Sequence, residues 1–350
     1  MKKKILILDG IAGVPLGREL TKAISDEGID TSYLDMKKFD HKVFYGLKSV
    51  VYKSLNKIES SDGFYQYPRL NENKFERYIQ LINPSIILVI GFVYKFLNPL
   101  FLQKMKEKYD IKLFLYDTDS CNLYAKRREF IYFLDNELPV YDEILSFSKV
   151  TTRFFKETKK LNASFFPFGA NRLNVVSNAT FSFEVLFVGS CDLRRIFLLE
   201  SIKDNVTIYG DRWSRNFPLI SDTLKTKVVD QGIWGNQLLN MLVQSKIVLN
   251  ITRSHFYGVE TGVNLRIFEA LSAGCFLLSD YSDELAELFD VGVEIETFTS
   301  SRELSEKVEY YLNHPDERMK IAKKGHEKFL AMHSWDVKAK LLLNKIIHTH

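Results

Sequence analysis

The chain has 350 residues, of which 46% are hydrophobic and 13% aromatic, and it carries a formal net charge of +4 at pH 7. This length and apolar content are sufficient for two packed domains and exclude an intrinsically disordered chain. The net charge is small, and no nucleic acid is expected among the partners.

The charge is unevenly distributed between the two halves. Residues 1–170 contain 27 Lys and Arg against 21 Asp and Glu, whereas residues 171–350 contain 21 against 23. The basic excess of the first half suits an anionic acceptor or an acidic membrane surface. The alternative is an ordinary solvated face.

The cysteines and the first residues indicate the compartment. The three cysteines are far apart and form no C-x-x-C pair, which is typical of a reducing compartment. The opening MKKKILILDG has lysines before an apolar run, but Asp9 ends this run too early for a signal peptide or a membrane span. We therefore expect a cytoplasmic protein, with a peripheral position at the inner face of the membrane as a variant.

Short apolar runs typical of strands alternate with helical stretches. They lie at residues 4–9, 85–91, 112–117, 143–148 and 163–168, and then at 183–190, 206–210, 246–252, 275–280 and 293–297. Continuously apolar strands between helices indicate parallel sheets that are covered on both faces. The sequence therefore predicts two α/β sheets in tandem, whose ligands should lie at the carboxyl ends of the strands.

The end of the chain is helical in pattern. From Ser301 onward no strand-like run appears; Ser301 is a candidate N-cap, and Pro315 should open a further helix. We expect an N-terminal domain over residues 1–170, a second domain over 171–330, and a helix over 331–350 that packs back on the first domain.

The stretch TGVNLRIFEALSAGCFLLSDY, residues 261–281, places Arg266 and Glu269 in an apolar helical run between two expected strands. A helix over residues 263–273 would open its N-terminus at the strand ends, where backbone N–H groups and the helix dipole favour a phosphate. Arg266 would add a charge-assisted contact, and the Glu269 carboxylate could accept hydrogen bonds from both hydroxyls of a ribose. The alternative is a solvent-exposed pair at i, i+3 on a helix surface.

Several motifs occur together in the second half. They are FEVLFVGS at 183–190, IYGDRW at 208–213, LVQSKIVLNI at 242–251, GVNLRIFEALSAGCFLLSDY at 262–281 and a helical stretch from FTSSREL at 298 to HSW at 335. In this combination, residues 183–340 resemble the donor half of GT-B glycosyltransferases, specifically the bacterial CgeB-like group of the retaining glycosyltransferase clan. The first half matches only in general pattern.

This resemblance implies an α/β chain of GT-B fold, with two Rossmann-like domains that face a central cleft and a C-terminal helical segment. The implied activity is the transfer of a sugar from a UDP-, dTDP- or GDP-linked donor to a glycan, lipid-linked or protein acceptor in bacterial glycan biosynthesis. The implied reaction retains configuration and needs no metal or other cofactor. If it inverts instead, a base must come from the first half.

The resemblance also implies which residues hold the donor. The expected donor-binding residues are Gly189, Ser190, Arg194, Arg195, Tyr209, Trp213, Gly262, Val263, Asn264, Arg266 and Glu269. In related enzymes the residue at Glu269 binds the ribose, and the turn that carries Gly189 and Ser190 contacts the diphosphate.

Three of these roles have alternatives. One of Arg194 and Arg195 should neutralise the leaving group, and the other should be a surface residue. Trp213 should lie near the base, or else in the core. Many relatives have a carboxylate eight residues before the ribose-binding Glu; that position is Thr261 here, with Glu260 one step away. His255 could contact a phosphate or lie on the surface.

The first half offers acceptor-side candidates. Asp9, Gly10 and Gly13 follow the first expected strand, but the glycine spacing does not give the G-x-G-x-x-G of a dinucleotide site. Asp117 and Asp119 form a D-x-D, the pattern with which GT-A enzymes hold a divalent metal. We expect these two aspartates to be cleft residues and, together with Arg266, to serve catalysis, with a metal site as the rival interpretation.

Other interpretations stay open. The segment 41–70 mixes aromatics with lysines, so it could contact a sugar or lipid-linked acceptor, lie on a membrane, or pack at the domain edge. A dehydrogenase would need the dinucleotide fingerprint that the sequence lacks. A non-catalytic protein that binds a sugar or a nucleotide is the second alternative, because Thr261 replaces the carboxylate of many relatives.

Overall fold

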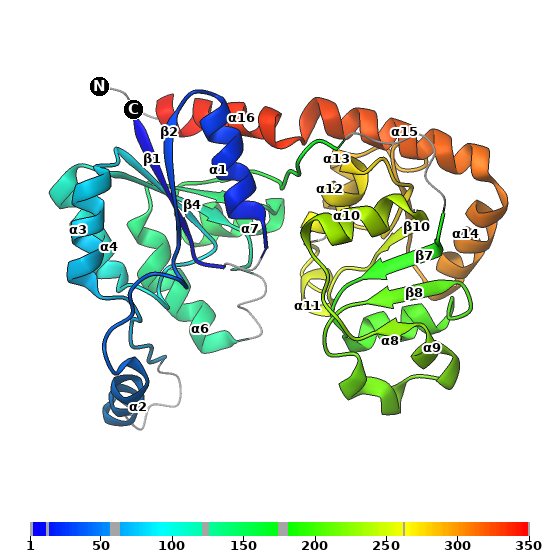
Figure 1. Ribbon diagram of the computed structural model, residues 1–350, viewed down its shortest axis with the longest axis horizontal. Helices are drawn as coiled ribbons and strands as arrows, with labels where there is room; N and C mark the ends of the chain where they lie inside the picture. The colour runs from blue at the N-terminus through cyan, green and yellow to red at the C-terminus, as the bar shows by residue number, and fades with distance from the viewer. Residues whose placement is uncertain are drawn as a thin grey trace. The chain divides into compact units, whose positions relative to one another are not determined.

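A computed structural model describes residues 3–11, 14–56, 64–120, 126–173, 181–261 and 263–348, and the chain forms two compact units (Figure 1). Unit 1 comprises Met1–Pro167 and Ala339–His350, and unit 2 comprises Phe168–Lys338. Two candidate site residues, Gly13 and Gly262, lie outside the described residues. Within the described ranges, no helix has the combination of length and apolarity that a membrane crossing requires.

Unit 1 is a parallel six-stranded sheet in the order β2-β1-β3-β4-β5-β6. Its strands are β1 (Lys4–Asp9), β2 (Asp30–Asp35), β3 (Ile86–Ile90), β4 (Lys112–Asp117), β5 (Glu143–Ser146) and β6 (Ala163–Phe165). Its helices are α1 (Leu16–Asp26), α2 (Tyr45–Leu55), α3 (Glu72–Ile82), α4 (Pro99–Tyr109), α6 (Arg127–Tyr132), α7 (Lys149–Arg153) and the end of α16 (Trp335–His348). The residues of β3 are all buried, as a strand covered on both faces requires.

Unit 2 is a second parallel six-stranded sheet, in the order β12-β11-β10-β7-β8-β9. Its strands are β7 (Phe183–Val188), β8 (Val206–Tyr209), β9 (Val228–Val229), β10 (Ser245–Asn250), β11 (Leu277–Asp280) and β12 (Glu296–Phe298). The helices between them are α8 (Leu193–Glu200), α9 (Asp222–Thr226), α10 (Gly235–Val243), α11 (Ser254–Tyr257), α12 (Leu265–Ser272) and α13 (Asp283–Leu288). Helix α12 packs against α15 (Pro315–Met332), whereas α14 (Ser301–Asn313) packs against α8.

The two parallel sheets and the helical end confirm the main predictions from the sequence. Pro315 opens α15, as expected. The expected N-cap at Ser301 was wrong by one residue: the hydroxyl of Ser300 accepts the backbone N–H of Glu303, and the Glu303 carboxylate accepts the backbone N–H of Thr299. This reciprocal arrangement satisfies two N–H groups at the helix start, which is why the helix begins there.

Candidate functional site

The topology of unit 2 defines one crevice. From β7 the chain continues outward to β8 and β9, and it then returns to β10 on the other side of β7 before β11 and β12. The carboxyl ends of β7 and β10 therefore flank the topological switch point, where ligands of open α/β sheets bind. Gly189 and Ser190 follow β7, and Ile251 and Thr252 follow β10.

Arg195 closes this crevice at its base. Its Nε and Nη2 donate to the carbonyl of Ile251 at 3.0 and 2.6 Å, and its Nη1 donates to the carbonyl of Ser190 at 2.7 Å. The side chain is buried, and this desolvation lowers the pKa of Arg195 to about 10. Arg195 thus fits neither of the two roles expected for these arginines, a surface residue or a ligand of the leaving group. It is buried, and its guanidinium already donates to carbonyl groups that follow β7 and β10 and so links the ends of these two strands.

Arg194 lies beside it in a different setting. Its Nη1 donates to the carbonyl of Thr252 at 3.0 Å and pairs with the carboxylate of Asp280 at 2.7 Å, and its guanidinium carbon lies 3.6 Å from the ring centroid of Tyr257. Asp280 ends β11 and is buried; burial raises its pKa, whereas the charge and hydrogen bond of Arg194 oppose that rise. Arg194 therefore joins the ends of β10 and β11 while a fifth of its side chain stays exposed.

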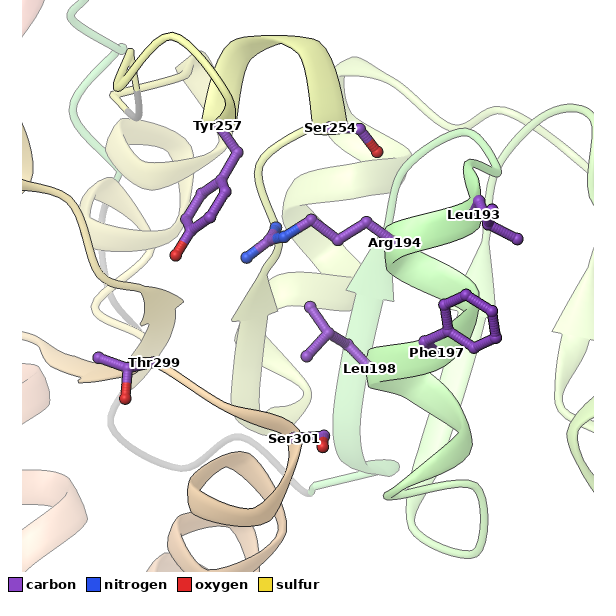
Figure 2. A pocket seen from close by; sticks show the side chains of 8 residues that line it. All are labelled: Leu193, Arg194, Phe197, Leu198, Ser254, Tyr257, Thr299 and Ser301. Atoms are coloured by element: carbon purple, nitrogen blue, oxygen red, sulfur yellow. The ribbon is translucent and has the colours of Figure 1, made fainter.

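A cavity opens next to Arg194. It has a volume of about 500 Å³ and is lined by Leu193, Arg194, Phe197, Leu198, Ser254, Tyr257, Thr299 and Ser301. Figure 2 shows the guanidinium reaching from α8 toward Tyr257 in the middle of this group, with the hydroxyl-bearing Thr299 and Ser301 on the far side. A positive charge, an aromatic ring and several hydroxyl groups make the cavity suitable for an anionic, polar ligand.

A chain of amide and hydroxyl groups fixes the start of α12. The side-chain oxygen of Asn264 accepts the backbone N–H of Arg266, and its amide donates to the side-chain oxygen of Asn250 at 2.9 Å. Asn250 in turn donates to the hydroxyl of Ser279, also at 2.9 Å. Because Asn250 ends β10 and Ser279 belongs to β11, the first turn of α12 is held against the carboxyl ends of both strands.

Arg266 and Glu269 form an ion pair on this first turn, with Nη1 of Arg266 2.6 Å from Oε2 of Glu269. Both side chains are only 11% exposed. The i, i+3 spacing is that of the alternative, a solvent-exposed pair on a helix surface. The burial argues against this alternative, because both groups of a solvated pair would be in contact with water. Among the described residues, Nε of Arg266 is buried without a hydrogen-bond partner. A buried N–H without an acceptor is costly, so a ligand that supplied one would gain free energy.

The other predicted donor residues lie close by but are less accessible. Trp213 is fully buried and donates from Nε1 to the carbonyl of Gly189, which favours the core interpretation. Gly189 also donates its N–H to the carbonyl of half-buried Tyr209. A Cβ on the next residue, Gly210, would stand 2.0 Å from the Gly189 carbonyl oxygen, so only glycine fits this approach of the ends of β7 and β8. The side chain of Val263 is buried, which leaves its backbone for a ligand contact.

The loop before α12 differs from the pattern of many relatives. Thr261, at the position of their carboxylate, is buried and donates from Oγ1 to the carbonyl of Phe256 at 3.2 Å. Glu260 is exposed, with a φ of 59° that is uncommon for a residue with a side chain. His255 is half-buried, and burial, followed by the charge of Arg253, lowers its pKa. Without a ligand, this environment favours the neutral imidazole, whereas a bound phosphate would favour its protonated form.

In unit 1 the aspartates at the strand ends accept hydrogen bonds from other groups of the chain. Asp9 is fully buried; its Oδ1 accepts the N–H of Ile11, and its Oδ2 accepts the hydroxyl of Tyr33 at 2.8 Å. Behind it, a Cβ on Gly10 would stand 1.8 Å from the carbonyl oxygen of Phe92. Asp9 therefore hydrogen-bonds within unit 1, and Gly10 has a packing role at the end of β1; their place on the acceptor side stays a prediction.

The D-x-D pair behaves similarly. Asp117 is fully buried; its Oδ1 accepts the N–H of Ser120, and its Oδ2 accepts the hydroxyls of Ser120 and Ser146, both at 2.8 Å. Burial raises the pKa of Asp117, although these hydrogen bonds oppose the rise. Asp119 is half-exposed. The occupied oxygens of Asp117 argue against the rival metal site, and no cluster of three or more metal-ligating side chains occurs in the part of the chain that the structure describes.

The comparisons with known proteins agree with this geometry. Residues 194–344 match a family model described as glycosyl transferase-like. Among solved structures, the chain is similar to a glycosyltransferase from Rickettsia africae ESF-5 (12% identity, 100% of each chain, TM-score 0.63) and to sucrose-phosphate synthase from Thermosynechococcus elongatus (13%, 99% of this chain and 100% of that one, 0.65). It is also similar to HepE of Anabaena in complex with UDP and glucose (12%, 99% of each chain, 0.63). No curated protein matches the sequence.

The chain therefore has the GT-B fold of these glycosyltransferases, as the sequence predicted. The matched family region, from Arg194 onward, contains the cavity, the Arg194 bridge and the Arg266–Glu269 pair. The family match is to a glycosyl transferase-like model, and the solved structures with this fold include glycosyltransferases. The family match does not confirm the CgeB-like group expected from the motifs.

Some residues of this site had no place among the predicted ones. Asn250 and Asp280 organise α12 and Arg194, yet neither was among the predicted site residues. A signal was present, because each is a polar residue that ends an apolar strand at the edge where ligands bind. Tyr257 had no comparable signal; it ends the short helix α11 and contacts Arg194 only through the fold.

Proposed function

We propose that this protein is a retaining glycosyltransferase of the CgeB-like group that transfers a sugar from a nucleoside diphosphate without a metal. UDP is the first nucleotide to test, because HepE, which shares the fold, is described in complex with UDP, with UDP and glucose, and with UDP-glucose. The acceptor would be a glycan, a lipid-linked sugar or a protein.

The observation that carries this proposal is the nearly buried Arg266–Glu269 pair on the first turn of α12, in which Nε of Arg266 has no hydrogen-bond partner among the residues that the structure describes. In the bound state, the diphosphate would lie at the N-terminus of α12, where it would accept hydrogen bonds from backbone N–H groups and from Arg266. The ribose hydroxyls would donate to the Glu269 carboxylate. Asn264 would keep this turn in place for the ligand, and the backbone of Val263 would contact the ligand.

Arg194 and Arg195 would divide two tasks. Arg195 would act as a positioning residue, because its nitrogen atoms already donate to the carbonyls of Ile251 and Ser190. Arg194 lines the cavity and would reach the departing phosphate, while Asp280 and Tyr257 orient its guanidinium. Charge stabilisation of the leaving group by such preorganised donors is the largest catalytic contribution that these residues could make.

The reaction that fits these residues needs no side-chain base. The bond between the sugar C1 and the phosphate oxygen breaks, the acceptor oxygen bonds to C1 from the same face, and the acceptor proton passes to the departing phosphate oxygen. The burial of Asp9 and Asp117 supports this route over inversion, because a general base must reach the acceptor hydroxyl within hydrogen-bond distance.

A second candidate is a protein that binds a nucleotide or sugar without transferring it. The burial of Thr261 favours it, since Thr261 stands at the position of a carboxylate in many enzymes that this chain resembles. The two candidates agree on nucleotide binding at α12 and differ only in turnover. A metal-dependent transfer through Asp117 and Asp119 is a weaker third, because both oxygens of Asp117 accept hydrogen bonds from the chain.

The test combines binding with turnover. Thermal unfolding of the purified protein is measured with UDP, GDP, dTDP, CDP and ADP, with and without Mg²⁺, because a ligand that binds the folded state raises the melting temperature. Release of the nucleoside diphosphate from the matching nucleotide sugar is then followed over time. A metal-independent shift followed by release supports the proposal; a shift without release supports the binding protein; and the absence of any shift contradicts both.

A further inference from the structure

Helix α2 of unit 1 exposes the face that a helix normally buries. On one side, the rings of Tyr45 and Tyr52 lie 6.1 and 5.5 Å from the ring of Tyr67. Ser49, which lies between the two tyrosines in the sequence, is buried. The apolar residues point the other way: they are between 49 and 79% exposed and comprise Val43, Phe44, Leu47, Val50, Val51 and Leu55. Figure 1 shows α2 set apart from the sheet of unit 1, so its aromatic side is the one attached to the rest of that unit.

These apolar residues form one continuous stripe and are not scattered. Leu47, Val51 and Leu55 follow each other at spacings of four residues, which places them above one another on the surface of α2. Val50 lies beside them on the helix, and Val43 and Phe44 directly precede its first residue. A monomeric protein rarely exposes a contiguous apolar patch of this kind unless it meets a membrane or a partner.

The charges around the stripe indicate which surface it meets. Residues 41–56 contain Lys42, Lys48 and Lys53 and no Asp or Glu. Lys48 and Lys53 are exposed, and Lys42 lies with its ammonium 4.6 Å from the ring centroid of Tyr67, beside the start of the helix. An apolar stripe flanked by lysines and without carboxylates is typical of helices that lie in the interface of an anionic bilayer.

We infer that α2 docks unit 1 on a membrane surface rich in anionic phospholipids. The helix lies in the plane of the surface, with Phe44, Leu47, Val51 and Leu55 at the boundary between headgroups and acyl chains. Lys48 and Lys53 contact lipid phosphates. The six-residue excess of basic over acidic side chains in residues 1–170 acts in the same direction. Docking requires no nucleotide, so vesicle binding can be tested independently of sugar transfer.

Sedimentation with vesicles tests this inference. The full chain is mixed with vesicles of phosphatidylcholine alone or of phosphatidylcholine and phosphatidylglycerol, and the bound fraction is measured at increasing salt. We expect binding to the mixed vesicles that weakens with salt, since exposed charges are screened. The variant Leu47→Asp/Val51→Asp should bind the mixed vesicles at least about tenfold more weakly than the wild type, because two carboxylates would enter the apolar boundary.

Two further variants make the test specific. Leu81→Asp is the matched control, because Leu81 is also highly exposed in unit 1 but lies on α3; its binding should equal that of the wild type. Lys48→Glu/Lys53→Glu should reduce binding to the mixed vesicles and flatten the salt dependence. Circular dichroism establishes that each variant is folded, which we expect because all the replaced side chains are exposed.

Three outcomes would overturn the inference. The first is wild-type binding that Leu47→Asp/Val51→Asp leaves unchanged. The second is equal binding to the neutral and the mixed vesicles. The third is no vesicle binding together with a concentration-dependent self-association that Leu47→Asp/Val51→Asp abolishes, which would assign the stripe to a second copy of the chain.

Discussion

The two sheets of this protein have the same parallel architecture, but they use the polar groups at their strand ends differently. In unit 1, Asp9 and Asp117 end β1 and β4, are fully buried, and accept hydrogen bonds from their own loops and from Tyr33 of β2 and Ser146 of β5. In unit 2, Arg195 likewise donates to carbonyl groups of the chain, but within the described residues Nε of Arg266 has no hydrogen-bond partner. The difference teaches that a charged residue at a strand end is a ligand candidate only where its hydrogen bonds are incomplete.

The largest effect should come from Arg195, the structural arginine of unit 2. Arg195→Ala leaves the carbonyls of Ile251 and Ser190 without their donor and opens a space beneath the crevice, so we expect a loss of about 3 kcal/mol in the free energy of unfolding. Urea unfolding measures it. Arg194→Ala is the matched comparison and should cost clearly less, because that side chain is partly exposed. Equal losses would remove the distinction between the two arginines.

The next effect concerns Glu269, the proposed ribose ligand. Glu269→Ala should weaken nucleoside diphosphate binding by about 1 to 3 kcal/mol, because the ribose hydroxyls lose their acceptor. Calorimetric titration of the variant checks this, and its unfolding curve establishes that it is folded. Glu260→Ala provides the control, since Glu260 is exposed in the loop before α12. An unchanged affinity in folded Glu269→Ala would remove Glu269 from the site.

A third effect is a dependence of stability on pH that arises from His333, which packs against Phe268 of α12. The ring of His333 lies 5.1 Å from those of Phe268 and Phe289, and burial, followed by the charge of Lys338, lowers its pKa to about 3. Between pH 6.5 and about 3 the unfolded chain binds a proton there that the folded chain does not, so stability falls as the pH falls through this window. At pH 5 this loss amounts to about 2 kcal/mol.

His333→Phe isolates that contribution. The variant and the wild type are unfolded with urea at pH 7.5 and at pH 5, and the change between the two pH values is compared. We expect the variant to lose less stability than the wild type on going to pH 5, by about 2 kcal/mol. In unit 1, burial raises the pKa of Glu137 to about 7, which gives the opposite slope between pH 4.5 and 7 in both proteins. Identical pH dependences would show that His333 is protonated in the folded state.

The smallest effect should come from unit 1. Asp119→Asn should change the rate of sugar transfer by less than about twofold, because the proposed route uses no side-chain base, whereas loss of a general base typically costs roughly 10²- to 10⁴-fold. Initial rates of nucleoside diphosphate release measure it. A loss in the range of a general base would transfer catalysis to unit 1 and would favour inversion.

The sequence predicted the long buried strands but not the marginal ones. β3 was recognised because all its residues are apolar, and β10 because it contains the buried apolar run 247–249, as burial on both faces demands. β2 reads DTSYLD and is half-buried at the edge of its sheet, and β9 has two residues, so neither gives a strong pattern. Such edge strands form through pairing with a neighbour, which a local pattern does not encode.

For the site, the sequence placed the helix and its two charges but not their hydrogen bonds. Helix α12 was expected over residues 263–273 and covers Leu265–Ser272. That its charges are nearly buried depends on the contacts of Asn264 with Asn250 and of Asn250 with Ser279, which join segments far apart in the sequence. The burial of Trp213 and Arg195 likewise follows from tertiary packing around the end of β7.

The central claim is that the start of α12 binds a nucleoside diphosphate through Arg266 and Glu269, and one measurement tests it most directly. The dissociation constant of UDP, or of the diphosphate that stabilises the protein most, is determined by calorimetry for the wild type and for Arg266→Lys. Lysine keeps the charge but lacks the guanidinium fork and its Nε, so we predict a loss of affinity of about tenfold or more. An Arg266→Lys protein that is folded and binds the nucleotide as tightly as the wild type would contradict the account.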